Sequence, residues 1–311
     1  MNSGILSSHS YSHNHVLMER LLMSLVKRWA AGSNMEDAIV AAKNCNLRGQ
    51  RVILNRLGEE FTEENKINQV TEEYSSLLGR LYLENVEGSI SVKLSQLGLS
   101  ISHVLCLKNL KSLVRRAKEL DKFVWIDMES SKYTDDTLMI YFEMLRCHKR
   151  IGVVLQSALR RSASDLLHLI EVGGIVRLVK GAYHENEQIS FTSPSEVKAN
   201  YTKLLDIIFD SSHTIFTKVN NDDIKFAIAT HDSYLVDYAI RLSRVLGFPK
   251  NNFEFEFLKG IRDDLKRSLV GQGFIVAEYV PYGDEWLSYS IRRLRERKRN
   301  LFLLAHSLVQ S

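Results

Sequence analysis

The feature that most constrains the fold of this chain is a regular alternation of short apolar runs with amphipathic stretches. The runs are Arg51–Leu54, Ser89–Leu94, Phe123–Asp127, Ile151–Gln156, Ile175–Lys180, Phe226–Thr230, Phe253–Leu258 and Phe274–Tyr279. Each is short enough for a strand, and parallel strands need a crossover connection, usually a helix, to join them. Eight such units in about 250 residues is the count of a (β/α)8 barrel. We therefore predict an α/β fold of this type.

The segments between the runs have the apolar spacing of helices with one buried face. The clearest are Leu105–Leu120, Asp136–His148, Ser195–Phe209 and Ser233–Leu246, and a further amphipathic segment, Glu285–Arg297, follows the last run. An open doubly wound sheet is the rival fold, but it normally has fewer strands. No GxGxxG motif follows the first run, which lowers the expectation of a dinucleotide-binding sheet further.

The first 48 residues read as an N-terminal helical extension. The segment Val16–Ala31 has leucines at the spacing of one helix face, and Asn34–Cys45 starts with a residue that favours helix N-termini. The chain has only three prolines and no tract that resembles a linker. We predict an extension over residues 1–48 and one catalytic barrel domain over residues 49–311.

Composition excludes several classes of protein. A formal net charge of +4, spread along the chain, gives no basic patch for nucleic acid. Apolar runs stay below the roughly 18–20 residues that a membrane span needs, and the polar N-terminus does not read as a signal peptide. The three cysteines, Cys45, Cys106 and Cys147, are widely spaced, which favours reduced thiols. We therefore expect a cytoplasmic protein. We expect no metal site, because the N-terminal histidines have no further ligands nearby.

Polar and ionisable residues stand at or near the ends of the predicted strands. They are Lys93, Asp127, Gln156, Arg177, Lys180, Thr230, His231, Asp232, Glu256 and Tyr279, with Glu129 close behind. In a (β/α)8 barrel the carboxyl ends of the strands form the open mouth, while interior positions should be Val, Ile or Leu. Buried charges persist when they are paired or hold a ligand. The pattern therefore indicates a mouth that binds a charged ligand, and a ring of structural ion pairs is the alternative.

Two segments carry the most information about that ligand. After the fifth run, Gly181 and Ala182 lack bulk, so that a planar ligand can approach the backbone closely. In the last segment, Tyr289, Arg292 and Arg293 share one helix face. Paired arginines suit a carboxylate, because the guanidinium is planar, bidentate and always charged. The alternative is a basic helix face that only contacts solvent.

Together these stretches resemble the proline dehydrogenase family, in particular its compact single-function bacterial form. The matching segments are SVKLSQLGL (91–99), IDME (126–129), VLQS (154–157), RLVKGAY (177–183), ATHD (229–232), FEFEFLKG (253–260), YVPYG (279–283) and YSIRRLRE (289–296). They occur in order from the second predicted strand to the last helix. Each is weak alone, whereas the joint match is specific.

The resemblance implies noncovalently bound FAD at the barrel mouth and L-proline as the substrate, oxidised to 1-pyrroline-5-carboxylate by hydride transfer to flavin N5. The positions that match flavin contacts are Met128, Gln156, Arg177, Lys180, Gly181, Ala182, Thr230, His231 and Glu256. The positions that match the substrate site are Lys93, Leu258, Tyr279, Tyr289, Arg292 and Arg293. Asp127 and Arg177 match catalytic positions, with Lys93 as the expected ion-pair partner of Asp127.

The resemblance also implies a quinone as electron acceptor, peripheral contact with the inner face of a membrane, and a downstream pyrroline-5-carboxylate dehydrogenase. Two residues depart from the family pattern: Glu256 replaces a commoner Gln, and Lys259 replaces an aromatic residue or His. A carboxylate cannot donate the hydrogen bond of the amide unless it is protonated. Tyr289 is retained, which favours proline over hydroxyproline.

Two other functions are consistent with the same residues. Lys180 at a barrel mouth could form a Schiff base, as in class I aldolases, if its amine were neutral. A barrel without catalytic activity, used as a binding or regulatory module, is the third possibility, because a fold alone does not determine function.

Overall fold

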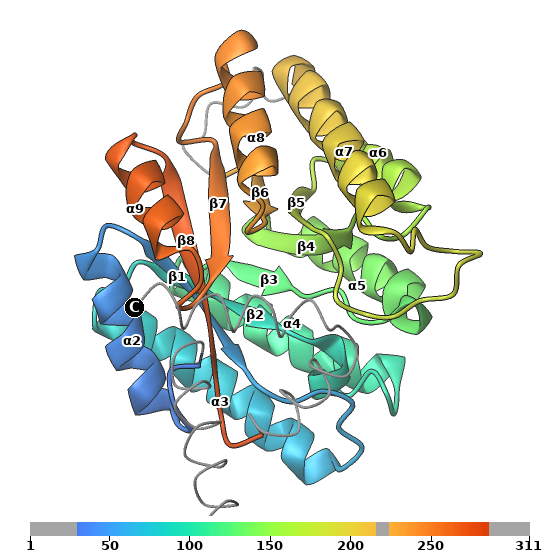
Figure 1. Ribbon diagram of the computed structural model, residues 1–311. Coiled ribbons are helices and arrows are strands. Elements are labelled where there is room, and N and C mark those ends of the chain that lie inside the picture. The colour runs from blue at the N-terminus through green and yellow to red at the C-terminus, as the bar shows by residue number, and fades with distance from the viewer. Residues whose placement is uncertain (1–29, 216–223, 286–311) are drawn as a thin grey trace, which may run out of the picture.

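The chain folds into a closed barrel of parallel strands (Figure 1). The computed structural model describes residues 30–215 and 224–285. The strands are β1 (Arg51–Arg56), β2 (Gly88–Val92), β3 (Val124–Ile126), β4 (Ile151–Gln156), β5 (Ile175–Val179), β6 (Phe226–Ala229), β7 (Phe253–Leu258) and β8 (Ile275–Tyr282). Each pairs with the next in parallel, and β8 pairs with β1 to close the ring. The predicted (β/α)8 barrel is confirmed.

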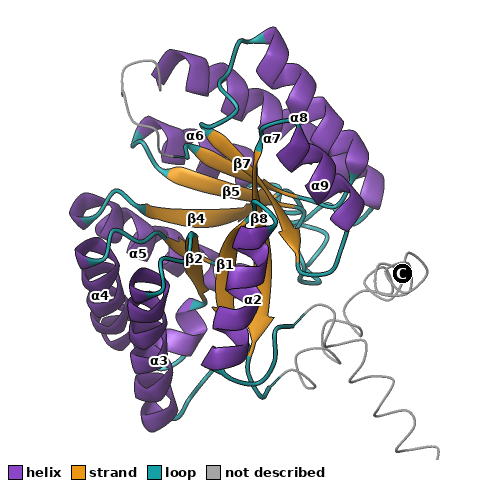
Figure 2. Cartoon of the chain, turned by 90° about the vertical axis from the view of Figure 1, so that its left-hand side faces the viewer, coloured by secondary structure: helices purple, strands orange, loops and turns teal. Residues whose placement is uncertain are grey.

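Helices cover the outside of the strands (Figure 2). They are α2 (Met35–Leu47), α3 (Glu64–Leu83), α4 (His103–Glu119), α5 (Thr134–Cys147), α6 (Ser162–Glu171), α7 (Pro194–Ile215), α8 (Ser233–Val245) and α9 (Asp263–Gly271), with two short 3-10 turns, η1 (Leu94–Leu97) and η2 (Ser131–Tyr133). Asn34 caps α2 as its side chain accepts a hydrogen bond from the Asp37 N–H at 3.0 Å.

Helix α2 packs against both β1 and β8, the two strands that close the barrel. A buried group joins it to the strand: Glu278 on β8 accepts hydrogen bonds from Cys45 and Arg48, each at 3.1 Å, and pairs with Lys266 of α9. The division into an extension over residues 1–48 and a barrel over 49–311 stays a prediction. Most of Val16–Ala31 and nearly all of Glu285–Arg297 lie outside the described residues.

The strands separate two interiors. Their outward side chains, such as Val52 and Leu54, join the large core beneath the helices. The inward side chains include a small apolar cluster of Ile53, Trp125, Ala227 and Ala277. Next to this cluster the interior carries charge, since buried Arg177 and Glu256 pair in register with Ala227 and Ala277. The expectation that interior positions would be Val, Ile or Leu is wrong for this layer, because the charges there compensate one another.

Candidate active site

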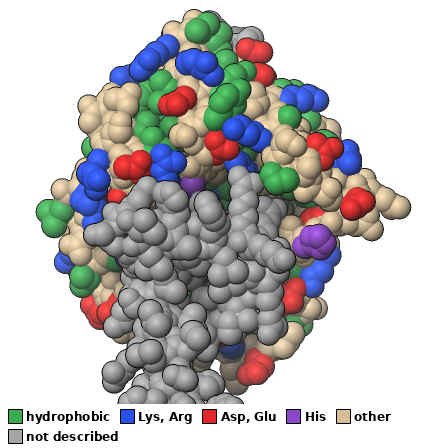
Figure 3. All heavy atoms as spheres, in the orientation of Figure 1, with side chains coloured by type: hydrophobic (Ala, Val, Ile, Leu, Met, Phe, Trp, Pro, Cys, Tyr) green, Lys and Arg blue, Asp and Glu red, His purple; other side chains and the backbone are tan. Residues whose placement is uncertain are grey.

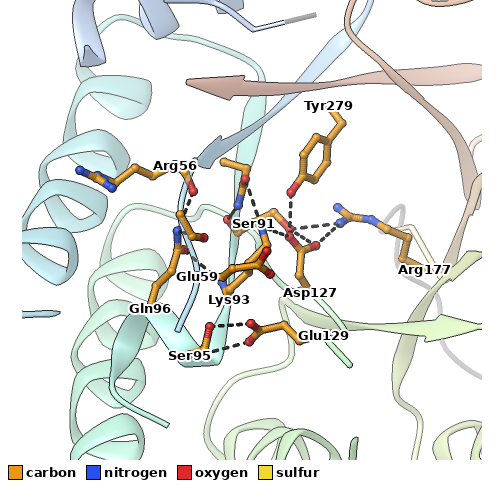
Figure 4. A network of polar contacts seen from close by, with 12 residues as sticks. Arg56, Glu59, Ser91, Lys93, Ser95, Gln96, Asp127, Glu129, Arg177 and Tyr279 are labelled. Carbon is orange, nitrogen blue, oxygen red and sulfur yellow. Dashed lines mark hydrogen bonds and ion pairs between the residues drawn. The ribbon is translucent and has the colours of Figure 1, made fainter. Parts of the chain in front are cut away.

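The centre of the barrel mouth is the carboxylate of Asp127, which directly follows β3. Its Oδ1 accepts hydrogen bonds from Ser91 Oγ at 2.7 Å and from Arg177 Nη1 at 3.1 Å. Its Oδ2 accepts a hydrogen bond from the Tyr279 hydroxyl at 2.7 Å and lies 3.5 Å from Lys93 Nζ. Figure 4 shows these side chains converging from β2, β3, β5 and β8. The Lys93–Asp127 ion pair expected from the sequence is therefore present.

Burial and charge oppose each other at Asp127. Burial alone would raise the pKa of this carboxyl group, but Lys93 and Arg177 act in the opposite direction, as do the hydrogen bonds from Tyr279 and Ser91. The net result is a pKa below the usual value for aspartate. Asp127 is therefore a carboxylate at neutral pH and acts here as a fixed negative charge.

Arg177 enters the same cluster from β5 and is only 2% exposed. Its Nε lies 2.6 Å from Glu256 Oε2, and its guanidinium lies over the Trp125 ring at 4.3 Å from the centroid and 5.6 Å from that of Tyr279. Burial would lower the pKa of Arg177, but Glu256 and Asp127 more than offset this effect. Among the described residues, its Nη2 is a buried donor without a hydrogen-bond partner. A ligand that supplies an acceptor would satisfy it.

The rim beyond this cluster is formed by the residues after β5, β6 and β7. Lys180 Nζ lies 2.7 Å from Asp232 Oδ2, and Lys198 Nζ lies 3.5 Å from Asp232 Oδ1. Thr230 is buried and accepts a hydrogen bond from the Asp232 N–H. Leu258, at the end of β7, is 36% exposed. These positions match the strand ends that the sequence singled out.

His231 is held neutral at this rim. Its Nε2 accepts a hydrogen bond from the Leu258 N–H at 3.1 Å, a role that requires an unprotonated nitrogen. Burial lowers the pKa of His231 to about 3, and the nearby cations Lys266, Arg262 and Lys180 add to this effect. The imidazole therefore stays uncharged in the folded protein throughout the neutral range.

This lowered pKa predicts a loss of stability in mild acid. Between the unfolded pKa of about 6.5 and the folded value, the unfolded chain binds the extra proton, so stability falls as pH falls. Allowing for partial exposure of His231, we expect the free energy of unfolding to drop by about 1–2 kcal/mol more in the wild type than in His231→Gln between about pH 7 and 5. Urea unfolding measures this difference. His168→Gln, an exposed histidine on α6, is the control, and equal losses in wild type and His231→Gln would contradict the assignment.

Two residues shape the floor between β4 and β5. Gly181 has φ +106°, and a Cβ there would meet Gln156 Oε1 at 3.0 Å and Ala158 Cβ at 3.1 Å, so glycine is required. Gln156 is buried, and its Nε2 donates to the Glu129 carbonyl at 2.9 Å. The Glu129 carboxyl accepts from Ser95 N at 3.0 Å and Ser95 Oγ at 2.5 Å. Met128 and Ala182 stand beside them, buried and partly exposed respectively.

The structure leaves some predicted residues untested and adds others. Tyr289, Arg292 and Arg293 lie outside the described residues. Sequence reasoning missed four polar or aromatic members of the interior, which are Asn55, Ser91, Trp125 and Glu254. Three of them stand two residues before a position that the sequence singled out, and Asn55 stands two residues after the inward Ile53. The two-residue repeat of a strand was the signal that could have found them.

The described surface carries no single dominant charge on the face seen in Figure 3, where basic and acidic side chains are interspersed. Among the described helices, none has the length and apolar character needed to cross a membrane. Within the same residues, no cluster of His, Cys, Asp and Glu has the arrangement of a metal site.

Comparison with known proteins places this arrangement in a family. The family model described as proline dehydrogenase matches residues 38–304. The chain belongs to the proline dehydrogenase family. Proline dehydrogenase 1 of Bacillus subtilis (strain 168) is 31% identical over 275 residues, covering 88% of this chain and 87% of the relative. Proline dehydrogenase of Deinococcus radiodurans is 29% identical over 299 residues, covering 94% and 93%.

Solved structures of similar fold include proline utilization A of Bdellovibrio bacteriovorus inactivated by N-propargylglycine. It superimposes with a TM-score of 0.79 at 21% identity over 89% of this chain. The chain spans about a third of the length of that protein, 33%. This likeness supports the barrel, while family membership rests on the family model and the curated relatives.

Proposed function

We propose that this protein catalyses the FAD-dependent oxidation of L-proline to 1-pyrroline-5-carboxylate, with electrons passed on to a quinone. The observation that carries the proposal is the cluster of Lys93, Asp127, Arg177 and Tyr279, two of them buried, at the mouth of a barrel that belongs to the proline dehydrogenase family. Both charge signs are present there in fixed geometry, which suits a substrate that carries a carboxylate and an amine.

The mouth fits a flavin cofactor. Arg177 has a buried Nη2 donor that lacks a partner among the described residues, and Lys180 and Gln156 stand beside it at the ends of neighbouring strands. The further contacts would come from Met128, Gly181, Ala182, Thr230, His231 and Glu256. When bound, FAD would accept the hydride of proline at N5. Positive charge from Arg177 would favour the electron-rich reduced ring.

The substrate carboxylate would be held by cations. Lys93 is 5% exposed and faces Asp127. Arg292 and Arg293, in the segment that the sequence predicts as helical, would complete the clamp. Tyr279, Tyr289 and Leu258 would wall the proline ring. The chain's contribution is orientation of the reacting carbon, together with exclusion of water by the buried cluster. The proline nitrogen must be neutral to release the hydride, so we expect activity to rise with pH.

Arg292→Ala tests the clamp. Loss of one bidentate, charge-assisted contact should raise the KM for proline about tenfold or more, while the flavin stays bound. Steady-state kinetics and the flavin-to-protein ratio measure both quantities. Lysine at the same position should restore only part of the affinity. An unchanged KM in Arg292→Ala would remove this residue from the clamp.

The electron acceptor and partners are proposed from the same family membership. A quinone resides in a membrane, so we propose peripheral contact with the inner face of a membrane by an otherwise cytoplasmic protein. A pyrroline-5-carboxylate dehydrogenase would consume the product. Flotation with vesicles that contain a quinone, with and without proline, tests the membrane contact directly.

The structure weighs against the Schiff-base alternative. The Asp232 carboxylate, 2.7 Å from Lys180 Nζ, stabilises the charged amine, whereas a Schiff base needs the neutral one. The purified protein should be yellow, and acid should release a flavin that chromatography identifies as FAD. A colourless protein in which borohydride fixes a carbonyl substrate on Lys180 would overturn the proposed function in favour of the lyase. A colourless protein without either activity would favour a binding module.

A further inference from the structure

Strand β7 places two carboxyl groups inside the barrel, one above the other. Glu254 and Glu256 are two residues apart, so both side chains leave the strand on its inner face. They are 3% and 2% exposed. In the register of the sheet three of their four partners are alanines: Ala227 pairs with Glu254, and Ala229 and Ala277 both pair with Glu256, while Ile275 is the second partner of Glu254. This leaves room for the two carboxyl groups to approach each other beneath the cluster at the mouth.

The cations around the pair are distributed unevenly. Glu256 Oε2 lies 2.6 Å from Arg177 Nε, a close ion pair between two fully buried groups. Glu254 Oε2 lies 3.9 Å from Arg51 Nη1, and Arg51 makes a shorter contact of 2.7 Å with Glu87 at the surface. The ion pair of Glu254 with Arg51 is therefore longer than that of Glu256 with Arg177, and Glu254 shares its arginine with Glu87.

Other charged groups lie near the pair. Asp127 lies on the far side of Arg177 and adds negative charge to the same cluster. Lys225 is buried just before the neighbouring β6, whereas the cations that lower the pKa of Glu254 are Arg51 and Arg177. Two carboxylates that share a site in low dielectric cannot both ionise cheaply, and one of them keeps a proton.

The ionisation of each group follows from these neighbours. Burial raises the pKa of Glu254 well above its usual value, and the adjacent Glu256 raises it further. The pKa of Glu256 is also raised by burial, but Arg177 and a hydrogen bond from Glu254 make this rise smaller than that of Glu254. Glu254 is thus the member that carries the proton, and Glu256 is the member that carries the charge.

We propose that Glu254 and Glu256 together bind one proton, which Glu254 carries. The pair therefore presents one negative charge to Arg177 instead of two. Glu256 is then a positioning residue that acts through Arg177. Its carboxylate fixes the guanidinium from below, while Asp127 and Ser91 fix it from the side. The part of this proposal that concerns the flavin rests on the proposed function, because there Arg177 lies beside the cofactor. The shared proton itself does not.

The glutamate at position 256 has a defined consequence in this arrangement. A neutral glutamine there would leave Arg177 with less compensating negative charge, so a flavin beside it would be easier to reduce. The Glu256 carboxylate thus lowers the reduction potential of a bound flavin, and the neutral Glu254 adds no second negative charge to that effect.

Infrared difference spectroscopy on the full chain tests the shared proton. At about pH 7, where an unperturbed glutamic acid is ionised, the wild type should show the carbonyl stretch of a protonated carboxyl group, shifted in heavy water. Glu254→Gln should lose this component. Glu278→Gln is the matched control, a buried carboxylate of β8 paired with Lys266 and Arg48, and it should keep the component. Glu129→Gln assigns any separate contribution from Glu129, whose pKa is also raised by burial.

Glu254→Gln spectra that keep every carboxyl component would overturn the shared proton. If Glu254→Gln does not fold, the pH titration of Glu129→Gln decides instead, because there the component must persist through neutral pH. No flavin is needed for either result, so a colourless protein would refute the proposed function and leave this test intact.

The reduction potential of the holoenzyme tests the positioning role. Glu256→Gln should shift the flavin midpoint potential upward relative to the wild type, and Glu278→Gln should not shift it. A merely structural role for Glu256 would lower flavin content or stability without moving the potential. An unchanged potential in folded, flavin-loaded Glu256→Gln would overturn the positioning role.

Discussion

Asp127→Asn is expected to lower kcat/KM for proline about a hundredfold or more, because it removes the negative charge on which the cluster at the mouth converges. The carboxylate accepts three hydrogen bonds, from Ser91, Arg177 and Tyr279, and compensates the charge of Lys93. An amide keeps one acceptor oxygen and turns an N–H₂ group toward donors. Lys93 and Arg177 would then be buried cations with less compensation, so that their geometry would relax.

Steady-state kinetics and flavin content measure this effect, and urea unfolding separates it from instability. Removal of one partner from a buried charge pair costs roughly 3–5 kcal/mol, so a measurable loss of stability should accompany the kinetic loss. Asp165→Asn on α6, where the carboxylate pairs with Arg161 at the surface, is the control and should behave as wild type. Kinetics within about threefold of wild type in Asp127→Asn would contradict the central place of this residue.

Arg177→Met is expected to slow proline-dependent flavin reduction by about 100- to 1000-fold. Methionine keeps much of the volume and the contact with Trp125, but removes the charge that would stabilise the reduced ring. It also leaves the Glu256 and Asp127 carboxylates without their shared cation. The barrier therefore rises at the reductive step, and substrate binding by Lys93 should change less.

Rapid-mixing absorbance under anaerobic conditions isolates that step. Arg177→Lys retains charge without the planar, bidentate geometry, so its rate should fall between the other two. Flavin content must be measured alongside, because Arg177 would also contact the cofactor. Wild-type single-turnover rates in flavin-loaded Arg177→Met would remove Arg177 from the reaction.

The strand ends could be predicted from the sequence because each strand is a separate short apolar run. The runs Ile151–Gln156 and Phe253–Leu258 match β4 and β7 at both ends. Other bounds moved, and β8 extends to Tyr282 because its pairing with β1 continues up to Arg56. Such pairing depends on a strand more than 200 residues away, which local composition does not encode.

The barrel interior was harder to predict. Glu256 stood at a strand end and was singled out, while Glu254, two residues earlier, was not. Glu254 lies within the strand, on the inward face of β7. Its ion-pair partner is Arg51 on β1, which is far away in the sequence. The same holds for Trp125, which supports Arg177 from inside the ring. Side-chain direction follows from the strand repeat, but what a side chain meets across the barrel follows only from closure.

Oxidation of proline on a flavin bound at this barrel mouth can be observed by adding L-proline to the purified protein in the absence of oxygen. We predict that the flavin absorbance bleaches and that an equivalent amount of 1-pyrroline-5-carboxylate forms in the same single turnover. A flavin that stays oxidised at saturating proline, or a preparation that contains no flavin, would refute the proposed reaction.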